Sequence, residues 1–388
     1  REVNIFGTDG IRGRAGEGHL AADSVEKISA ALASVLLEKE NFPVDIEPGR
    51  GRAVYIGRDT RASGPELLAQ LSGGLLGAGF EVCDLGVLPT PGIAEVARSA
   101  EECCMAIVLS ASHNPAADNG IKMLSSSGAK VSDRFEAELS NRFSSGGLSM
   151  EPGSSQARDL SAEAFERYAD YLVASCPDEL DGLRVCVDAA HGAASGIARE
   201  VFRRLGAEVR AIGDQPDGMN INDGCGALYP EVLADVVKES GYDIGFCFDG
   251  DADRLIPVSG NGNVFDGDLV LALAGRYYKE KGKLPGKAVV GTVMSNIGLA
   301  RSLEDVGIEL IRTPVGDRNV FKAMVEGEHP VGGEQSGHII FRDHSSTGDG
   351  ILAALKLLQF LRACGGDLDQ GAEVMTTYPQ VLKNVRVR

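Results

Sequence analysis

One short loop of the sequence holds three aspartates, Asp249, Asp251 and Asp253, within Asp-Gly-Asp-Ala-Asp-Arg. Carboxylates at positions i, i+2 and i+4 can direct their oxygens at one hard cation, and three like charges this close cost energy unless something neutralises them. The apolar run 242–248 in front of the loop predicts a buried strand that ends there. We therefore expect a divalent metal, Mg²⁺ before others, rather than a solvated acidic turn.

The same spacing also opens the loop of a calcium-binding EF-hand, and the sequence excludes that alternative. The sixth position of such a loop needs Gly, where the chain has Arg254, and the twelfth needs Glu, where the chain has Gly260. A predicted strand also stands where an EF-hand has its first helix.

A second polar loop, 110–115 (SASHNP), follows the apolar run 103–109. Open α/β sheets bind ligands at such strand ends. Ser112 beside His113 suggests a nucleophile with its base, but adjacent side chains rarely face each other and no Gly-x-Ser-x-Gly elbow is present. A role of Ser112 as phosphate carrier has fewer requirements than a role as base-activated nucleophile: exposure, nearby hydrogen-bond donors and a cation. Lys122 supplies an ammonium within one strand or turn.

Two further loops have residue types suited to ligands. The N-terminal loop 6–13 (FGTDGIRG) can approach a ligand closely through its Gly residues, and Arg12 adds a planar guanidinium suited to phosphate. A turn with a surface Arg is the alternative. In 332–338 (GGEQSGH), Glu334 and Ser336 are acceptors flanked by Gly, which fits hydrogen bonds to vicinal sugar hydroxyls. A capped turn is the alternative for this loop.

His338, at the end of that loop, is expected to be a structural histidine with satisfied hydrogen bonds. The sequence contains no Walker A, Gly-x-Gly-x-x-Gly or His-Glu-x-x-His motif, so nucleotide binding by those routes is not supported.

Three segments of the chain share one order of elements: an apolar strand, a polar or Gly-rich loop, an amphipathic helix, a Gly, and a second strand. The predicted first strands and helices are, in order, 53–57 and 64–77, 184–188 and 194–205, and 288–292 and 297–305. Gly79, Gly206 and Gly307 follow these helices, where a left-handed residue is needed. Strands covered by helices on both faces have continuous apolar runs, as these do. The repeat therefore predicts three similar α/β domains.

The 388 residues divide into these three domains and a short remainder. The Ser/Gly/Pro-rich stretch 144–160 is expected to be a linker. Residues 380–387 alternate like an exposed strand, and we expect them to begin a fourth domain that the chain otherwise lacks. The predicted domains are 1–150 with the SASHNP loop, 151–256 with the aspartate loop, 257–370 with the GGEQSGH loop, and 371–388 as linker and start of domain IV.

Composition limits the partners and the compartment. The formal net charge of −18 repels nucleic acid and anionic lipid, so neither is an expected partner. No apolar run reaches the ~18 residues of a transmembrane helix, and the first residues contain no signal-peptide core. The eight cysteines include no Cys-x-x-Cys pair, and several, such as Cys186 and Cys247, lie in apolar strand-like runs. Buried free thiols of this kind favour a cytoplasmic location.

FGTDGIRG, SASHNP, DGDADR and GGEQSGH occur in this order, and together they resemble the α-D-phosphohexomutase family. The segment 314–318 (PVGDR) and the Gly-Glu-Gln-Ser-Gly-His form are typical of the branch that acts on glucosamine phosphates; other members usually carry His at the position of Asp317. The resemblance implies an α/β fold of related mixed α/β domains around one cleft, with three present here and the fourth absent apart from its first strand. Ala252 departs from the family pattern, where Gly is common, and should be tolerated because it points between the ligands.

The resemblance also implies roles for individual residues, with Ser112 as the phosphoserine and Lys122 as a general acid/base. The implied catalytic residues are Ser112, Lys122 and Arg12. The implied ligands of one Mg²⁺ per chain are Asp249, Asp251, Asp253 and, through a phosphate oxygen, Ser112. The implied substrate-binding residues are Glu334, Ser336, Arg254 and Asp317.

The activity implied is interconversion of glucosamine 6-phosphate and glucosamine 1-phosphate through a phosphoserine enzyme and a 1,6-bisphosphate intermediate. The phosphosugar is the expected partner, glucosamine or glucose 1,6-bisphosphate the expected activator, and a homodimer is left open. A phosphomannomutase or phosphoglucomutase of the same fold is the nearest alternative. A weakly catalytic sugar-phosphate-binding protein lacking domain IV and a metal-dependent phosphatase are the others.

Overall fold

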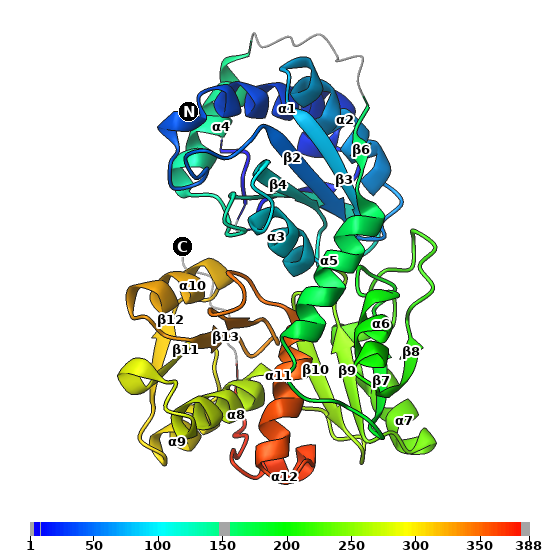
Figure 1. Ribbon diagram of the computed structural model, residues 1–388, viewed down its shortest axis with the longest axis vertical. Helices are drawn as coiled ribbons and strands as arrows, with labels where there is room; N and C mark the ends of the chain where they lie inside the picture. Colours follow the sequence, from blue (N-terminus) through cyan, green and yellow to red (C-terminus); the bar gives the residue numbers. More distant parts are fainter. Residues whose placement is uncertain (1–3, 8, 147–155, 382–388) are drawn as a thin grey trace.

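The computed structural model describes residues 4–7, 9–146 and 156–381. Three α/β units, each built on its own sheet, make up this part of the chain (Figure 1). The first lies at the top of the view, the second at the lower right and the third at the lower left. The predicted fold class, three related mixed α/β domains, is confirmed.

The first domain has a six-stranded sheet in the order β1-β5-β4-β2-β3-β6, in which β2, β3, β4 and β6 are parallel and β1 and β5 complete an antiparallel edge. Its strands are β1 Ile11–Arg14, β2 Ala53–Arg58, β3 Glu81–Val87, β4 Cys103–Leu109, β5 Asp118–Leu124 and β6 Arg158–Asp159. Its helices are α1 Ala22–Leu37, α2 Gly64–Gly77, α3 Thr90–Arg98 and α4 Asp133–Ser145.

The second and third domains have four-stranded sheets, in the orders β10-β9-β7-β8 and β12-β11-β13-β14. The second contains β7 Arg184–Asp188, β8 Glu208–Ile212, β9 Ile244–Phe248, β10 Leu255–Ser259, α5 Ser161–Ala174, α6 Ile197–Arg204 and α7 Pro230–Ser240. The third contains β11 Ala288–Thr292, β12 Glu309–Thr313, β13 Val331–Gly333, β14 Ile339–Phe341, α8 Gly267–Glu280, α9 Ile297–Glu304, α10 Asp317–Glu326, α11 Gly350–Ala363 and α12 Leu368–Ala372.

The predicted repeat is present in all three sheets. In each, a first strand pairs in parallel with the two strands that follow it, and a fourth strand returns antiparallel beside the third. The predicted helix-closing glycines all have positive φ: 79° at Gly79, 95° at Gly206 and 67° at Gly307. Gly adopts this left-handed backbone at little cost, so the helix can end and the next strand can begin immediately.

Because of this repeat, three of the polar loops lie at equivalent positions in their domains. The SASHNP loop joins β4 to β5, the aspartate loop joins β9 to β10, and the GGEQSGH loop joins β13 to β14. Each loop therefore connects the third and fourth strands of the repeated unit. The structure reveals this equivalence, which the sequence repeat alone did not predict.

One apolar core runs through the three domains. It includes Tyr55 of the first sheet, Phe246 of the second and Val331 of the third. Helix α5 packs against β3 and α3 of the first domain and also against α6 of the second. Helix α11 packs on α8 and β14 of the third domain and on β10 of the second. These shared helices hold the domains, and hence their loops, at fixed positions.

Two expected segments differ from what the structure shows. The stretch 144–160, expected to be a linker, includes the end of α4 and strand β6, which pairs with β3; its residues 147–155 lie outside the described residues. Within the strand expected at 380–387, residues 380 and 381 are not in a strand, and the remainder lies outside the described part. All eight cysteines are free thiols, and Cys364 is the exposed one.

Candidate active site

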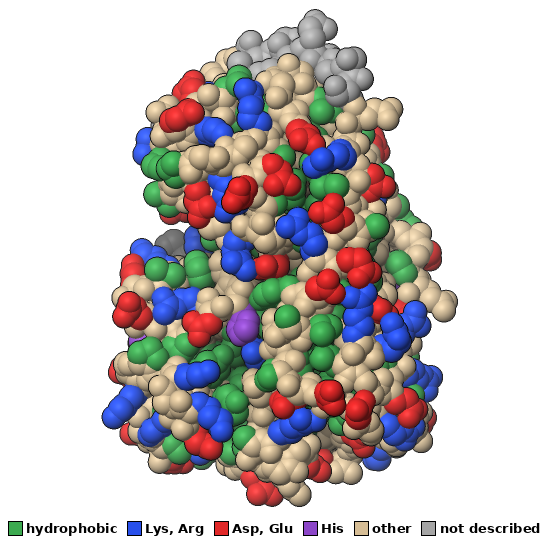
Figure 2. Space-filling model, viewed as in Figure 1, with side chains coloured by type: hydrophobic (Ala, Val, Ile, Leu, Met, Phe, Trp, Pro, Cys, Tyr) green, Lys and Arg blue, Asp and Glu red, His purple; other side chains and the backbone are tan. Residues whose placement is uncertain are grey.

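Side chains from the equivalent loops of the three domains meet between the sheets. Ser112 of the first domain reaches the aspartate loop of the second, and that loop reaches the GGEQSGH loop of the third, where Leu255 N–H donates to Gly337 O at 3.0 Å. On the surface, an indentation separates the first domain from the third at the left of the view (Figure 2). Residues far apart in sequence thus form one polar centre.

Ser112 stands at the tip of its loop with a left-handed backbone, φ +50°. Its hydroxyl is buried and donates to Asp249 Oδ2 at 2.7 Å. His113 Nδ1 lies farther from the hydroxyl, at 3.4 Å. Burial first, and then Arg254 and Arg12, lower the pKa of His113, so this imidazole is neutral near pH 7. The closest polar partner of Ser112 Oγ is therefore the carboxylate.

The three aspartates form a buried cluster that fits a divalent cation. One ligand oxygen from each lies within 4.8 Å of the others. Oδ2 of Asp251 accepts from Lys122 and Thr90, while Oδ1 of Asp251 and Oδ1 of Asp253 are buried without a hydrogen-bond partner. Buried carboxylate oxygens are seldom left unpaired, and hard cations take such ligands. The donor set matches the metal site expected from the sequence.

The charges in the cluster oppose one another. Burial first, and then Asp253 and Asp251, raise the pKa of Asp249. A divalent cation would remove this repulsion, and without one the buried carboxylates compete for cations from the protein. Ala252 adopts φ +55° between these ligands, a left-handed backbone that Gly would adopt at lower cost than Ala.

Lysine and arginine side chains surround the aspartates. Lys122 Nζ lies 2.8 Å from Asp251 Oδ2 and 3.3 Å from Asp9 Oδ2. Burial lowers the pKa of Lys122, but the charges of Asp251 and Asp9 raise it by a larger amount. The net shift of the pKa is upward, so the side chain is an ammonium. Arg254 Nε lies 3.9 Å from Asp249, and its side chain is about a quarter exposed. Arg12 pairs with Asp9 at the same centre.

The third domain contributes a loop with free acceptors. Glu334 Oε1 accepts from Gly316 N–H at 3.0 Å, which leaves its other oxygen for a ligand, and Ser336 is exposed. Asp317 instead pairs with Lys130 of the first domain at 2.7 Å. The predicted substrate contact by Asp317 thus competes with an ion pair between the domains.

His338 is the structural histidine that the sequence suggested. It is buried, Gly348 N–H donates to its Nε2 at 3.0 Å, and its Nδ1 lies 3.4 Å from Asp253 Oδ2. Burial lowers the pKa of His338, but the carboxylate of Asp253 beside Nδ1 raises it by more, to about 9. His338 therefore holds a carboxylate of the metal loop.

Comparisons with known proteins agree with this arrangement. Models of the phosphoglucomutase/phosphomannomutase α/β/α domains I, II and III match residues 3–149, 166–262 and 266–378. The chain belongs to the α-D-phosphohexomutase family. The order of the three matched domains is the order of the three sheets.

Individual relatives span nearly all of this phosphohexomutase. A phosphoglucosamine mutase of Desulforudis audaxviator is 45% identical over 99% of this chain and 84% of its own length. A phosphoglucosamine mutase of Thermobifida fusca has the same identity and coverage. The crystal structure of a phosphoglucomutase/phosphomannomutase family protein from Burkholderia thailandensis is 30% identical, covers 96% of this chain and 79% of that chain, and superposes with a TM-score of 0.79.

Three residues of this phosphohexomutase site were not identified from the sequence: Asp9, Thr90 and Lys130. Asp9 pairs with Lys122 and Lys130, and the Thr90 hydroxyl donates to Asp251 Oδ2 at 2.7 Å. Asp9 lies inside the quoted N-terminal motif, so its acidic side chain was an available signal. Thr90 precedes a Pro at the start of α3 and carries no local sign of a partner 161 residues away.

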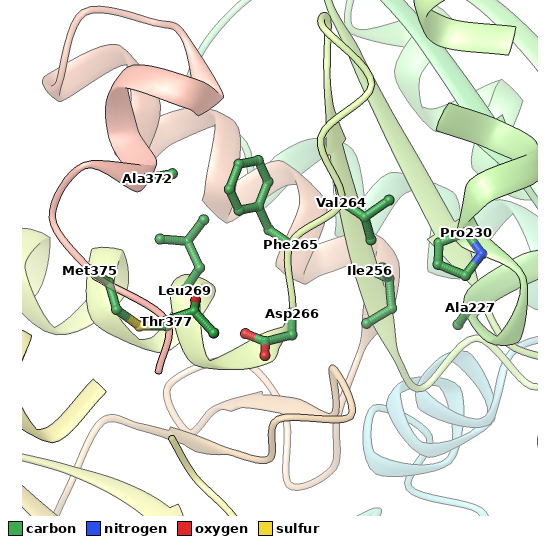
Figure 3. Close-up of a pocket in the computed structure, with 10 residues that line it drawn as sticks. All are labelled: Ala227, Pro230, Ile256, Val264, Phe265, Asp266, Leu269, Ala372, Met375 and Thr377. Atoms are coloured by element: carbon green, nitrogen blue, oxygen red, sulfur yellow. The ribbon is translucent and has the colours of Figure 1, made fainter. Parts of the chain in front are cut away.

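A separate pocket lies behind the GGEQSGH loop and contains none of the predicted site residues (Figure 3). It has a volume of about 280 Å³, and its mostly apolar lining includes Phe265, Leu269 and Met375. Asp266 connects it to the loop, because its Oδ2 accepts from Gln335 Nε2 at 3.0 Å.

Among the described residues, none of the helices has the length and apolar content to cross a bilayer.

Proposed function

We propose that this phosphohexomutase is a phosphoglucosamine mutase that interconverts glucosamine 6-phosphate and glucosamine 1-phosphate. The observation that carries the proposal is the contact of Ser112 Oγ with Asp249 at 2.7 Å, in a cluster with two unpaired carboxylate oxygens. The sugar preference is supported by relatives 41–45% identical that are named phosphoglucosamine mutases.

The metal site is proposed to hold one Mg²⁺ through Asp249, Asp251 and Asp253, with a phosphate oxygen on Ser112 as a further ligand. Mg²⁺ prefers oxygen ligands of this kind. When bound, it supplies positive charge to a phosphoryl group in transfer.

Ser112 is proposed to carry the phosphoryl group between substrate and product. In the forward direction, the bond from Ser112 Oγ to phosphorus breaks while a bond forms from phosphorus to the C1 oxygen of glucosamine 6-phosphate. The resulting 1,6-bisphosphate then reverses its orientation in the site, and its phosphoryl group on the C6 oxygen is transferred to Ser112. Lys122, held as an ammonium by Asp251 and Asp9, is proposed to stabilise the reacting oxygens, to donate a proton to Ser112 Oγ as its bond to phosphorus breaks, and to recover a proton from the C1 hydroxyl.

The remaining predicted residues are proposed to bind the substrate. Arg12 and Arg254 would contact phosphate oxygens, since guanidinium groups suit phosphate geometry. Glu334 would accept hydrogen bonds from sugar hydroxyls, and Ser336 would accept hydrogen bonds from them or donate to them, in both orientations of the bisphosphate. Asp317 would contact the substrate after its ion pair with Lys130 opens.

Several finer properties complete the proposal. The activator is glucosamine or glucose 1,6-bisphosphate, which would phosphorylate Ser112 of an enzyme that has lost its phosphate. The protein is proposed to act in the cytoplasm on a phosphosugar, with neither nucleic acid nor membrane as partner; a homodimer stays open. The domain boundaries proposed are 1–150, 151–256 and 257–370, followed by 371–388.

The test is turnover of glucosamine, mannose and glucose 6-phosphates with Mg²⁺ and glucose 1,6-bisphosphate, followed by phosphorus NMR. We expect glucosamine 6-phosphate to give the 1-phosphate ester fastest. Faster turnover of mannose 6-phosphate would contradict the sugar preference. Release of inorganic phosphate in place of the ester would indicate a phosphatase instead.

A further inference from the structure

Arg61 is a completely buried arginine whose partners lie in the Ser112 loop. It follows β2 in the first domain, and its side chain is 0% exposed. Its Nε donates to Asp59 Oδ2 at 2.9 Å. Its remaining N–H groups donate to the carbonyl oxygens of Ser112, Asn114, Pro115 and Asp118. All five guanidinium donors are thus used: three on carbonyls of the loop between β4 and β5, one on the first residue of β5 and one on Asp59.

The backbone of Ser112 is held on both sides. Its N–H donates to Ser110 Oγ at 2.9 Å, and that hydroxyl donates to Asp59 Oδ2 at 2.6 Å. Its carbonyl accepts from Arg61 at 3.1 Å and from Asn222 Nδ2, in the second domain, at 2.9 Å. Asp59 thus links both sides, because it also pairs with Arg61.

This support matters because Ser112 has φ +50°, which is unfavourable for a residue with a side chain. In this conformation Ser112 Oγ reaches Asp249 of the neighbouring domain. Gly250 lies so close to the Ser112 carbonyl that a Cβ there would clash with it. A relaxed Ser112 loop would therefore move the hydroxyl away from Asp249.

We propose that Arg61, assisted by Asn222, is a positioning residue that keeps Ser112 Oγ directed at the metal site. The inference rests on the proposed function of Ser112 as phosphoryl carrier. Lys cannot replace Arg61, because an ammonium has three donors from one point and cannot span four carbonyls. Arg61 makes no hydrogen bond or ion pair with the three aspartates, so its loss should impair transfer to Ser112 and leave Mg²⁺ binding by these aspartates intact.

The experiment measures phosphorylation of Ser112 by glucose 1,6-bisphosphate, using quenched intact-mass analysis, together with kcat, KM and Mg²⁺ affinity. We expect Arg61→Lys to lower the phosphorylation rate and kcat about 10²-fold, as for a small misplacement of a reacting group. Asn222→Ala should lower both about tenfold, as expected for loss of one or two hydrogen bonds. KM and Mg²⁺ affinity should stay within about twofold in both variants, since neither contact is made to substrate or metal.

Arg58→Lys is the matched control. Arg58 lies on β2 of the same domain and pairs with Asp84 at 2.8 Å, away from the Ser112 loop, so its variant should keep wild-type rates. An equal loss in Arg58→Lys, or wild-type rates in Asn222→Ala and folded Arg61→Lys, would overturn the inference. If Arg61→Lys does not fold, Asn222→Ala decides alone. A wild-type protein that is never phosphorylated on Ser112 would instead overturn the proposed function, and this inference with it.

Discussion

At the scale of single residues, two oxygens characterise the proposed metal site: Oδ1 of Asp251 and Oδ1 of Asp253, both buried without a hydrogen-bond partner, the second with Arg254 Nε at 3.8 Å. The other oxygens of these side chains face Lys122, Thr90 and His338. The protein side chains therefore fix each carboxylate through one oxygen and leave the second for a cation. Such outer contacts orient ligands and tune affinity.

Asp253→Asn tests this division. We expect Mg²⁺ near 100 times its dissociation constant to stabilise the wild-type protein by about 2.7 kcal/mol, seen as a higher Tm. The variant should bind Mg²⁺ at least about tenfold more weakly, because one charged ligand is lost. Titration followed by thermal unfolding measures both.

Asp84→Asn, at a carboxylate paired with Arg58, is the control and should keep the full Mg²⁺ shift. An Mg²⁺-dependent Tm shift of unchanged size in Asp253→Asn would show that the cation binds elsewhere.

At the scale of elements, helix α11 begins at a buried carboxylate. Asp349 caps the helix by accepting from Leu352 N–H at 2.9 Å, and Tyr168 Oη donates to its other oxygen at 2.9 Å. Burial raises the pKa of Asp349 to about 7, although both hydrogen bonds favour the charged form. The fold thus contains a helix cap that titrates near neutrality.

The raised pKa sets the sign of a pH effect. The folded protein binds this proton more tightly than the unfolded chain, in which Asp has its ordinary pKa of 3.8, so the contribution of Asp349 to stability falls as pH rises toward and through 7. Between pH 5 and pH 8, wild type should lose about 2 kcal/mol relative to Asp349→Asn. Urea unfolding of both proteins across this range measures the difference, and parallel pH profiles would contradict it.

The repeat shows what the sequence could predict at this scale. The strand and helix of each unit were located because apolar runs, amphipathic spacing and closing glycines are local signals, as at Gly79, Gly206 and Gly307. The meeting of Lys130 with Asp317 is not a local signal, because 187 residues separate them. Likewise, the edge strand β6 has only two residues and depends on pairing with β3.

At the scale of the whole molecule, ion pairs connect the first domain to the third across the site. Lys130 contacts Asp317 at 2.7 Å, and Arg318 contacts Glu136 at 2.6 Å and also pairs with Asp133. All these groups are partly exposed, so each pair contributes modestly, about 0.2–1 kcal/mol, and is weakened by salt. The contacts favour a closed arrangement of the first and third domains around the candidate site.

Arg318→Ala should therefore favour opening of the first domain from the third. We expect KM for the phosphosugar to rise about threefold, from the loss of roughly 0.6 kcal/mol, with the difference fading at high salt. Steady-state kinetics at two salt concentrations measure it. Lys322→Ala, on the same helix and paired at 3.9 Å with Glu326 on its exposed side, should leave KM unchanged. Equal KM values for both variants would contradict this role.

The central claim is that Ser112 carries the phosphoryl group beside the aspartate cluster, and intact-mass measurement tests it most directly. After incubation with glucose 1,6-bisphosphate and Mg²⁺, the wild-type protein should gain about 80 Da, the mass of one phosphoryl group. Ser112→Ala should gain nothing and should not convert glucosamine 6-phosphate. The same mass gain in Ser112→Ala, or mutase turnover by that variant, would contradict the account.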